Sequence, residues 1–566
     1  MKKGWKAGTS LCLALLLGGT MAACTGDPGT PNKPTPGDTT KTQNVRIFTY
    51  SGQEFDSVTM DTVMQEIEKK VNVKLSFEGA TEEDYYTKLS PMMNSGDWPD
   101  IIWSDPENSG GAFQTWADPK QELLYNLDEL IIGNEDRYPY LDKLINSKQY
   151  KNIKYYDGHY IVPMVQTMTA WAIYYRADWL EQIGFVDENG KAKAPETLAE
   201  FEYVMSRFSG TDLFTDANGN KSGKTWGISP NTRNFYVNPL YGAFGITPDW
   251  DISESGEVSY MYAREEFKPY LEWMHAMYEK GYIDNTFNQN KGFDDRQDWY
   301  DGKVGCIMTN GEGHFEYVVK NFENSQGAGK IIVGPPPVGT GEVSELTGCK
   351  LGVAGERGYS NWGGMYGGYA ITQGTKDPYR CLDLLEYLIS PEGSMLRLYG
   401  IEGKHYNLDA DGNVVVDIDG RNSERINYFD TVTNADDTKS SGGLHKMGGR
   451  FGYAVDWEYF DQTGEIKIAT DIAALFPKYS TLMREALGYT QYLQTSKLTN
   501  FTAYPSSINT YRSEVMNISE TLINRVITGS VDLNSGWTQM LKDLEGAKYA
   551  NVKSAIREAA QENGVI

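Results

Sequence analysis

The sequence predicts an α/β protein in which mainly parallel sheets are flanked by helices. Segments with strand character alternate with amphipathic helical segments over residues 45–105. Such alternation is typical of a parallel sheet with helices on its faces. The chain also has 566 residues, which is enough for two or more hydrophobic cores.

The first predicted strand is Val45–Tyr50 (VRIFTY), which is rich in β-branched and aromatic residues. Apolar residues at helical spacing predict a helix within Val58–Val71, and a second strand follows at 72–80 (NVKLSFEGA). A helix around Tyr85–Asn94 precedes a third strand, which opens after Pro99. Ligands of such sheets bind beyond the carboxyl ends of the strands, so we expect binding groups directly after the first and third strands.

The middle of the chain continues with strands and helices. Residues 170–185 (AWAIYYRADWLEQIGF) predict a strand followed by a helix. Thr197 and Glu200 form a capping box ahead of a further helix. Residues 302–311 (GKVGCIMTNG) predict a strand that ends in a glycine-containing turn.

The proline-rich segment 333–340 (VGPPPVGT) interrupts this pattern, and we interpret it as a connection between two lobes. Residues 367–372 (GGYAIT) then predict a strand, and two helices broken at Pro391 follow. Residues 409–413 (DADGN) predict a hairpin turn. The sequence has no internal repeat of fixed period.

The N-terminus predicts export and a membrane anchor. Three lysines in the first six residues precede a short apolar run, Leu11–Leu17, and small residues lead to Cys24. The run is too short to cross a bilayer core of about 30 Å, so residues 1–23 predict a signal peptide. The end of this segment, residues 21–24, resembles a bacterial lipobox with Cys24 as the acylated residue, although Met21 replaces the usual leucine. A plain signal peptide is the alternative. The Pro/Gly/Thr-rich stretch to residue 43 predicts a flexible linker.

Composition narrows the class of ligand. The net charge of −25 argues against nucleic acid and anionic lipid as partners. The 38 tyrosines and 13 tryptophans suit sugar-binding clefts, although most of them are expected to pack in ordinary ways. Cys306, Cys349 and Cys381 are too few and too widely spaced for a disulfide framework or a metal knuckle. One disulfide stays open, but we expect buried free thiols.

Several segments in order resemble the extracellular solute-binding proteins (family 1) of ABC-type sugar importers, especially the lipoprotein branch found largely in Gram-positive bacteria. They include GDWPDIIW, YYDGHYIVPM, YYRADWLEQIGF, WYDGKVGCIMTNG and YLISPEGSMLRLYGIEGKHYNLD. The resemblance implies a type II periplasmic-binding-protein-like fold: two α/β lobes, with the ligand cleft at the hinge. It places lobe 1 at 44–168 plus 341–400 and lobe 2 at 169–340 plus 401–566, with crossings near Val162–Trp171, near Pro335–Thr340 and near residue 400.

The resemblance also implies function. A member of this family is no enzyme: the expected protein is a monomer, lipid-anchored on the outer face of the cytoplasmic membrane. It captures an oligosaccharide and delivers it to the permease subunits of an ABC transporter. A peptide receptor remains an alternative. A surface-tethered glycoside hydrolase would need two catalytic carboxylates about 5–10 Å apart. With 77 acidic residues in the chain, the composition neither supports nor excludes such a pair. A surface adhesin would more often show all-β repeats.

Candidate ligand-binding residues follow from the family's placement of contacts in loops after strands. They are Ser51, Gln53, Glu54, Trp103, Asp105, Gln166, Trp171, Arg233, Phe235, Tyr236, Glu312, His314, Arg357, Tyr359, Trp362 and Tyr366. Aromatic rings would stack on sugar faces and polar groups would bond hydroxyls. The competing interpretations are helix capping for the first three, core packing for Trp103, and an ordinary surface loop for 355–368.

Two further motifs have structural interpretations. Arg176 is expected to cap a helix or to join elements rather than to bind ligand. Some relatives hold calcium in a loop like 216–227, where Asp216, Asn218 and Asn220 would be ligands. Calcium prefers six to eight oxygens, but lysines occupy two loop positions and Gly227 stands where a glutamate is needed. We therefore expect no cofactor and an Asx-rich turn here.

Overall fold

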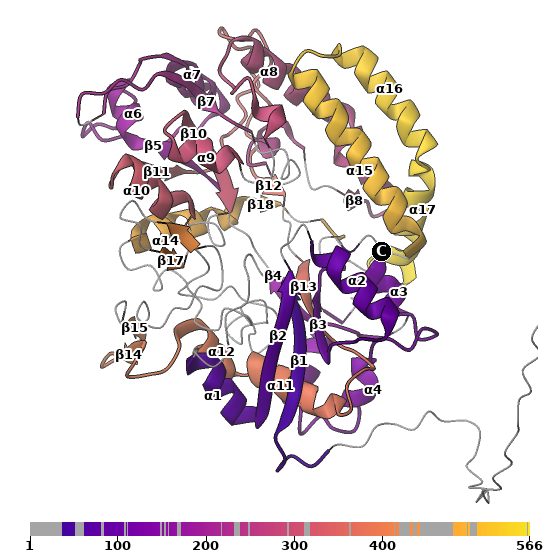
Figure 1. Ribbon diagram of the computed structural model, residues 1–566. Helices are drawn as coiled ribbons and strands as arrows, with labels where there is room; N and C mark the ends of the chain where they lie inside the picture. Colours follow the sequence, from indigo (N-terminus) through magenta and orange to yellow (C-terminus); the bar gives the residue numbers. More distant parts are fainter. Residues whose placement is uncertain are drawn as a thin grey trace, which may run out of the picture. The chain divides into compact units, whose positions relative to one another are not determined.

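Two five-stranded sheets organise the described part of the chain, and helices flank each of them (Figure 1). The structure is a computed structural model. It describes residues 37–50, 62–80, 84–106, 109, 111–147, 150–151, 154–156, 158–166, 171–216, 218–230, 238–246, 250–290, 294–310, 317–360, 364–412, 414–417, 431–433, 439–441, 479–494, 496–498, 506–562 and 564–566. These residues belong to one compact unit, Thr35–Ile566.

The first sheet has the order β2-β1-β3-β13-β4. Its strands are β1 (Gln43–Tyr50), β2 (Val73–Ala80), β3 (Ile101–Ser104), β4 (Val162–Gln166) and β13 (Gly364–Ile371). The first three are parallel, as predicted. β13 runs antiparallel to both β3 and β4, which makes the sheet mixed.

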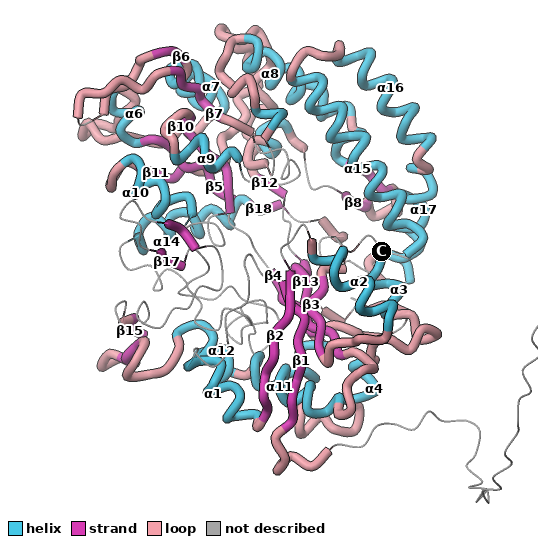
Figure 2. The backbone as a smooth tube through the Cα atoms, in the orientation of Figure 1, coloured by secondary structure: helices cyan, strands magenta, loops and turns pink. Residues whose placement is uncertain are grey.

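Helices flank the first sheet and close its core (Figure 2). They are α1 (Thr62–Val71), α2 (Tyr85–Ser95), α3 (Ala112–Trp116), α4 (Leu127–Ile131), α5 (Pro139–Ile145) and α11 (Pro378–Ile389). The core joins β1 side chains such as Val45 and Ile47 to Leu385 of α11, although more than 300 residues separate them in sequence. Burial of these apolar side chains is the main force that holds the elements together.

The second sheet has the order β11-β5-β10-β7-β6. Its strands are β5 (Trp171–Arg176), β6 (Gly210–Thr211), β7 (Lys224–Ile228), β10 (Val304–Asn310) and β11 (Ile331–Gly334). β7 and β10 are parallel, whereas β5 runs antiparallel to its neighbours β10 and β11. The accompanying helices are α6 (Ala177–Gln182), α7 (Leu198–Phe208), α8 (Lys268–Glu279), α9 (Asp294–Tyr300) and α10 (Phe322–Gln326).

The C-terminal helices extend the second core. Figure 1 shows α15 (Ser506–Ile527), α16 (Leu533–Gly546) and α17 (Tyr549–Glu562) side by side. Their buried side chains, such as Ile523 and Trp537, belong to the same cluster as Trp273 of α8. Smaller elements are β8 (Trp250–Ile252), β9 (Val258–Tyr260), β12 (Tyr359–Ser360), α12 (Pro391–Tyr399), β14 (Tyr406–Leu408), β15 (Val414–Val416), β16 (Thr431–Thr433), β17 (Lys439–Ser441), α14 (Ser480–Gly488) and β18 (Leu493–Gln494).

Several local predictions are confirmed. The capping box at Thr197 forms in both directions, since the Thr197 hydroxyl accepts from the Glu200 amide and the Glu200 carboxylate accepts from the Thr197 amide. The break at Pro391 separates α11 from α12. The turn at 409–412 joins β14 and β15 as an antiparallel hairpin.

The chain passes between the sheets at places that only partly match the predictions. β4 belongs to the first sheet and β5 to the second, so the predicted crossing near Val162–Trp171 is confirmed. The crossing predicted near Pro335–Thr340 is wrong. Leu351 packs in the second core and Tyr359 packs on Trp171, so the chain returns to the first sheet only before β13. The segment 341–356, which the resemblance places in lobe 1, therefore packs with the second sheet.

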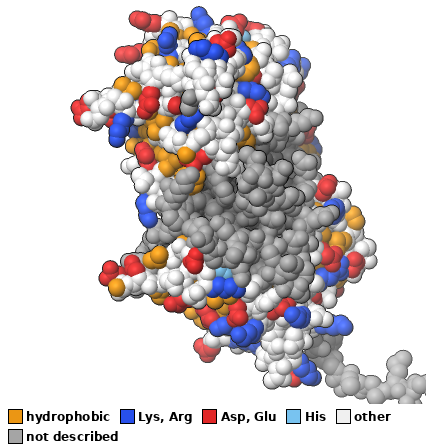
Figure 3. Space-filling view, turned by 60° about the vertical axis from the view of Figure 1, so that its left-hand side comes forward, with side chains coloured by type: hydrophobic (Ala, Val, Ile, Leu, Met, Phe, Trp, Pro, Cys, Tyr) orange, Lys and Arg blue, Asp and Glu red, His pale blue; other side chains and the backbone are white. Residues whose placement is uncertain are grey.

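The three described cysteines are free thiols, as expected, and two of them are buried. Cys306, Cys349 and Cys381 are free; Cys306 and Cys381 are buried, whereas Cys349 is only half-buried. Acidic and basic side chains of the described residues are interspersed on the face that Figure 3 shows. Among the described residues, no helix combines the length and the apolar character that a membrane span requires.

Candidate functional site

The carboxyl ends of strands converge at one edge of the second sheet. β7 and β10 are parallel and end at Ile228 and Asn310. β5 is antiparallel and pairs its first residue, Trp171, with Asn310. Trp171 therefore lies at the edge where a sheet of this type binds ligand.

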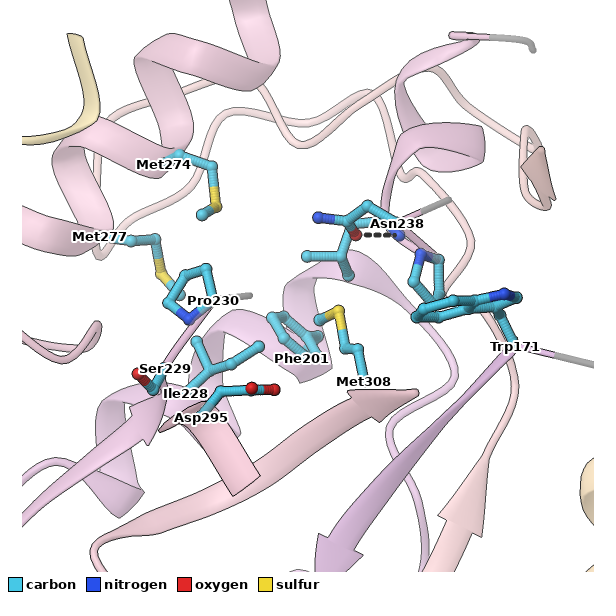
Figure 4. Close-up of a pocket in the computed structure, with 12 residues that line it drawn as sticks. Trp171, Phe201, Ile228, Ser229, Pro230, Asn238, Met274, Met277, Asp295 and Met308 are labelled. Carbon is cyan, nitrogen blue, oxygen red and sulfur yellow. Dashed lines mark hydrogen bonds between the residues drawn. The ribbon is translucent and has the colours of Figure 1, made fainter. Parts of the chain in front are cut away.

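A cavity of about 30 Å³ lies at this edge (Figure 4). Its lining comes from six helices and strands (β5, α7, β7, α8, α9 and β10) and from residues that follow β7: Trp171, Phe201, Ile228, Ser229, Pro230, Asn238, Pro239, Leu240, Met274, Met277, Asp295 and Met308. Trp171 lies at one side, and Met274 and Met277 of α8 lie at the opposite side. Most of the lining is apolar, and three of the twelve residues are methionines, whose flexible thioethers adapt to the shape of a ligand.

Two polar side chains of this lining are engaged by other parts of the protein. The Ser229 hydroxyl donates to Asp284 Oδ2 at 3.0 Å and accepts from Asn290 Nδ2 at 3.0 Å. Asn238 Nδ2 donates to the Tyr270 hydroxyl at 3.0 Å, and its Oδ1 accepts from the Leu240 amide at 2.8 Å. These bonds fix the wall and leave little polar capacity for a ligand.

Trp171 is the predicted site residue that lines this cavity. Only 5% of its surface is exposed, and its ring packs on the fully buried Tyr359. In the described part of the chain, the Trp171 Nε1–H has no hydrogen-bond partner. A buried donor without a partner is costly, at about 1–3 kcal/mol, and is uncommon in folded proteins.

Arg357 and Tyr359 lie near the same edge and contact other parts of the protein. Tyr359 lies in β12 beside Leu493 of β18. The Arg357 Nε donates to the Pro336 carbonyl at 3.0 Å, and its guanidinium lies 4.4 Å from the Tyr492 ring centre. The structure thus brings Trp171, Tyr359 and Arg357 into one region, and the Arg357 guanidinium makes contacts within the protein there.

The candidates of the first sheet lie at its own carboxyl edge. Trp103 packs edge-on against Tyr85, with ring centres 5.6 Å apart, and belongs to the core of the first sheet. Asp105 follows β3 and is buried, and its amide donates to the Tyr86 hydroxyl at 2.8 Å. Gln166 ends β4 and pairs with Gly364 of β13.

The other candidates cannot be placed. Tyr366 lies in β13, but its side chain is not among those described. Outside the described residues lie Cys24, Ser51, Gln53, Glu54, Arg233, Phe235, Tyr236, Glu312, His314 and Trp362.

Sequence reasoning missed most of the cavity lining. Ser229 and Pro230 directly follow β7, so the rule about carboxyl ends of strands could have found them. Met274 and Met277 lie on α8, where apolar residues at helical spacing indicate a packing face and nothing more.

The loop that resembles a calcium site is held by hydrogen bonds among its own residues. The Asp216 carboxylate already accepts from the Asn218 and Asn220 amides at 2.8 and 2.7 Å and from Asn220 Nδ2 at 2.8 Å. These hydrogen bonds, with that from the Asn220 side chain foremost, lower the pKa of Asp216. Lys221 Nζ donates to Thr215 Oγ1 at 2.9 Å.

The structural interpretation of Arg176 is confirmed: it is the N-cap residue of α6, although its side chain makes no capping hydrogen bond. Its Nε and Nη2 donate to the Asp178 carboxylate at 2.8 and 2.7 Å. Its guanidinium lies 4.5 Å from the Trp179 ring centre and 5.1 Å from that of Phe322. Arg176 therefore joins α6 to α10 at the end of β5 opposite Trp171.

No group of three or more histidine, cysteine or acidic side chains that could hold a metal occurs among the described residues. The cavity lining contains a single carboxylate, Asp295.

Comparison with known proteins identifies the family. The model of the bacterial extracellular solute-binding proteins matches residues 62–403, which is more than half of the chain. No curated protein sequence matches the chain.

Similar solved structures share the fold over nearly the whole chain. The alginate-binding protein AlgQ2 without calcium ion has a TM-score of 0.61 at 15% identity, covering 92% of this chain and 98% of its own. The EF-hand mutant of the S. pneumoniae ABC-transporter substrate-binding protein FusA, in complex with fructo-nystose, has a TM-score of 0.60 at 16% identity, with 92% and 99% covered. The HMO-binding solute-binding protein of Bifidobacterium longum infantis has a TM-score of 0.59 at 15% identity, with 94% and 99% covered. At these identities the likeness shows the two-lobe periplasmic-binding-protein-like fold.

Proposed function

The chain belongs to the bacterial extracellular solute-binding protein family, and we propose that it is the oligosaccharide receptor of an ABC importer. In this proposal the protein is anchored through acylated Cys24, captures its ligand outside the cell as a monomer, and presents it to the permease subunits. The energy for uptake comes from ATP hydrolysed by the transporter, so the receptor itself carries out no chemistry.

The observation that carries the proposal is Trp171 at the carboxyl edge of the second sheet. It combines a large aromatic ring, a bordering cavity and a buried N–H with no partner among the described residues. Sugars have both an apolar face and hydroxyl oxygens. An indole ring can stack on the apolar face, and its N–H can donate a hydrogen bond to a hydroxyl oxygen. The similar structures include proteins described with alginate, fructo-nystose and HMO, which supports an oligosaccharide as ligand class.

A titration with neutral and acidic oligosaccharides tests the proposal. Melting temperature and tryptophan fluorescence are followed together, and reducing ends are assayed afterwards. Saturable stabilisation with the glycan intact is the expected result. Cleavage of the glycan would instead indicate a hydrolase, and stabilisation by peptides alone would indicate a peptide receptor.

A pair of matched variants locates the site. Trp171→Phe removes the N–H but keeps an aromatic ring, and we expect the Kd to rise about tenfold, since a hydrogen bond contributes about 1 kcal/mol or more. Trp179 is also buried, but it stacks on Phe214 beyond the opposite end of β5. Trp179→Phe should lower stability without changing the Kd. Equal affinities of wild type and Trp171→Phe would remove Trp171 from the site.

A further inference from the structure

Resting on the function proposed above, we infer that the cavity beside Trp171 receives the acetamido group of an N-acetylated aminosugar. The ligand would then be an oligosaccharide that contains at least one such unit. The inference depends on the size of the cavity, on its walls and on its polar groups.

The size excludes a whole sugar ring. A buried water needs roughly 10–15 Å³ of such space, so a cavity of about 30 Å³ holds only a few heavy atoms. A pyranose ring with its hydroxyls is much larger. The cavity therefore fits a substituent, while the ring would lie outside it.

The walls select an apolar substituent. Met277, Met308 and Ile228 surround the space together with Phe201 (Figure 4). The Ser229 hydroxyl and the Asn238 amide are already bonded within the protein. A hydroxyl that entered here beyond the reach of Asp295 would lose its bonds to water and find few replacements, whereas a methyl group would lose nothing.

Asp295 supplies the one charged group. It is 4% exposed and lines the cavity from α9. A carboxylate accepts hydrogen bonds from several donors at once, so an amide N–H of the ligand can join the contacts that Asp295 already makes. A methyl group next to an N–H donor is the chemistry of an acetamido group, and a simple hydroxyl or a carboxylate lacks it.

Matched sugar pairs test the inference by isothermal titration calorimetry on the purified protein. N-acetyllactosamine is compared with lactose, and triacetylchitotriose with cellotriose. In each pair, the first sugar carries acetamido groups at positions where the second carries hydroxyls. We expect the acetylated member of at least one pair to bind at least tenfold more tightly. Equal affinities, or tighter binding of the hydroxyl member, would overturn the inference and leave the proposed function intact.

Methionine-to-glutamine variants locate the effect. Met308 lines the cavity, whereas Met92 is similarly half-buried against the core of the first sheet. Met308→Gln should weaken binding of the acetylated sugar more than that of its hydroxyl counterpart, and Met92→Gln should change neither. An equal loss in both variants would place the selectivity elsewhere. If no oligosaccharide of any kind binds the wild type, the proposed function fails together with this inference.

Discussion

Glu386 makes the stability of the first lobe depend on pH. Its carboxylate accepts from the Tyr140 and Leu141 amides at 2.9 and 2.8 Å, which joins α11 to the start of α5. Burial raises the pKa of Glu386 to about 7, against 4.5 for the free side chain, and the nearby carboxylates Asp383 and Asp142 add to the rise. The folded chain therefore holds a proton that the unfolded chain releases between pH 4.5 and 7. Stability falls as the pH rises through this window.

The size of the effect follows from the shift in pKa. A difference of about 2.5 units corresponds to about 3 kcal/mol, of which about 2 kcal/mol is lost between pH 5.5 and pH 8. Glu386→Gln cannot titrate, so its free energy of unfolding should lose about 2 kcal/mol less than that of the wild type over this range. Urea denaturation followed by circular dichroism at both pH values measures the difference.

Glu129→Gln serves as the control, because it removes an exposed carboxylate from α4. It should keep the pH dependence of the wild type. The reasoning fails if Glu386→Gln and the wild type lose the same free energy between pH 5.5 and 8.

Three further predictions follow from local geometry. Gly367 has φ +68°, and an added Cβ would lie 2.4 Å from a Trp103 ring carbon, so Gly367→Ala should cost about 3 kcal/mol in a urea melt; Gly96→Ala, at φ +84° in open space, should cost only about 1 kcal/mol. Because internal hydrogen bonds already satisfy Asp216, neither calcium nor EDTA should shift the melting temperature, and a rise with calcium would disprove this account. Burial raises the pKa of the Cys349 thiol, but this thiol is the most exposed of the three described. It should react first, though slowly, with a disulfide reagent at pH 8, and Cys349→Ser should abolish that phase.

Local patterns predicted most strands and helices correctly. The run Val45–Tyr50 and the capping box at Thr197 depend on neighbouring residues only, and both appear in the structure as expected. The hairpin at 409–412 is equally local. Such features can be predicted because the forces that form them act over a few residues.

The second crossing could not be predicted in the same way. Prolines at 335–337 indicate an interruption, but they do not indicate which sheet the chain joins next. Buried Glu202 ties residues 344–347 to the second core, because it accepts from Trp273 Nε1 at 2.9 Å, from Thr347 Oγ1 at 2.6 Å and from the Ser344 hydroxyl. These partners lie more than 70 residues from Glu202, and no local pattern connects them.

The candidate site was predicted in part for the same reason. Trp171 stands at the start of a strand that the sequence indicates clearly, so it could be named. Met277 and Met308 line the same cavity from α8 and β10. Their proximity depends on how the helix packs against the sheet, which the sequence of either element does not contain.

The short link between β4 and β5 limits how far the two sheets can separate at this point. Gln166 pairs within the first sheet and Trp171 within the second. Five residue steps of extended chain reach at most about 18 Å. Trp171 therefore stays within this distance of Gln166 in any motion of one sheet against the other. A ligand contact at Trp171 would be kept near the first sheet, so contacts far from this link, which can separate further, would govern the rate of release.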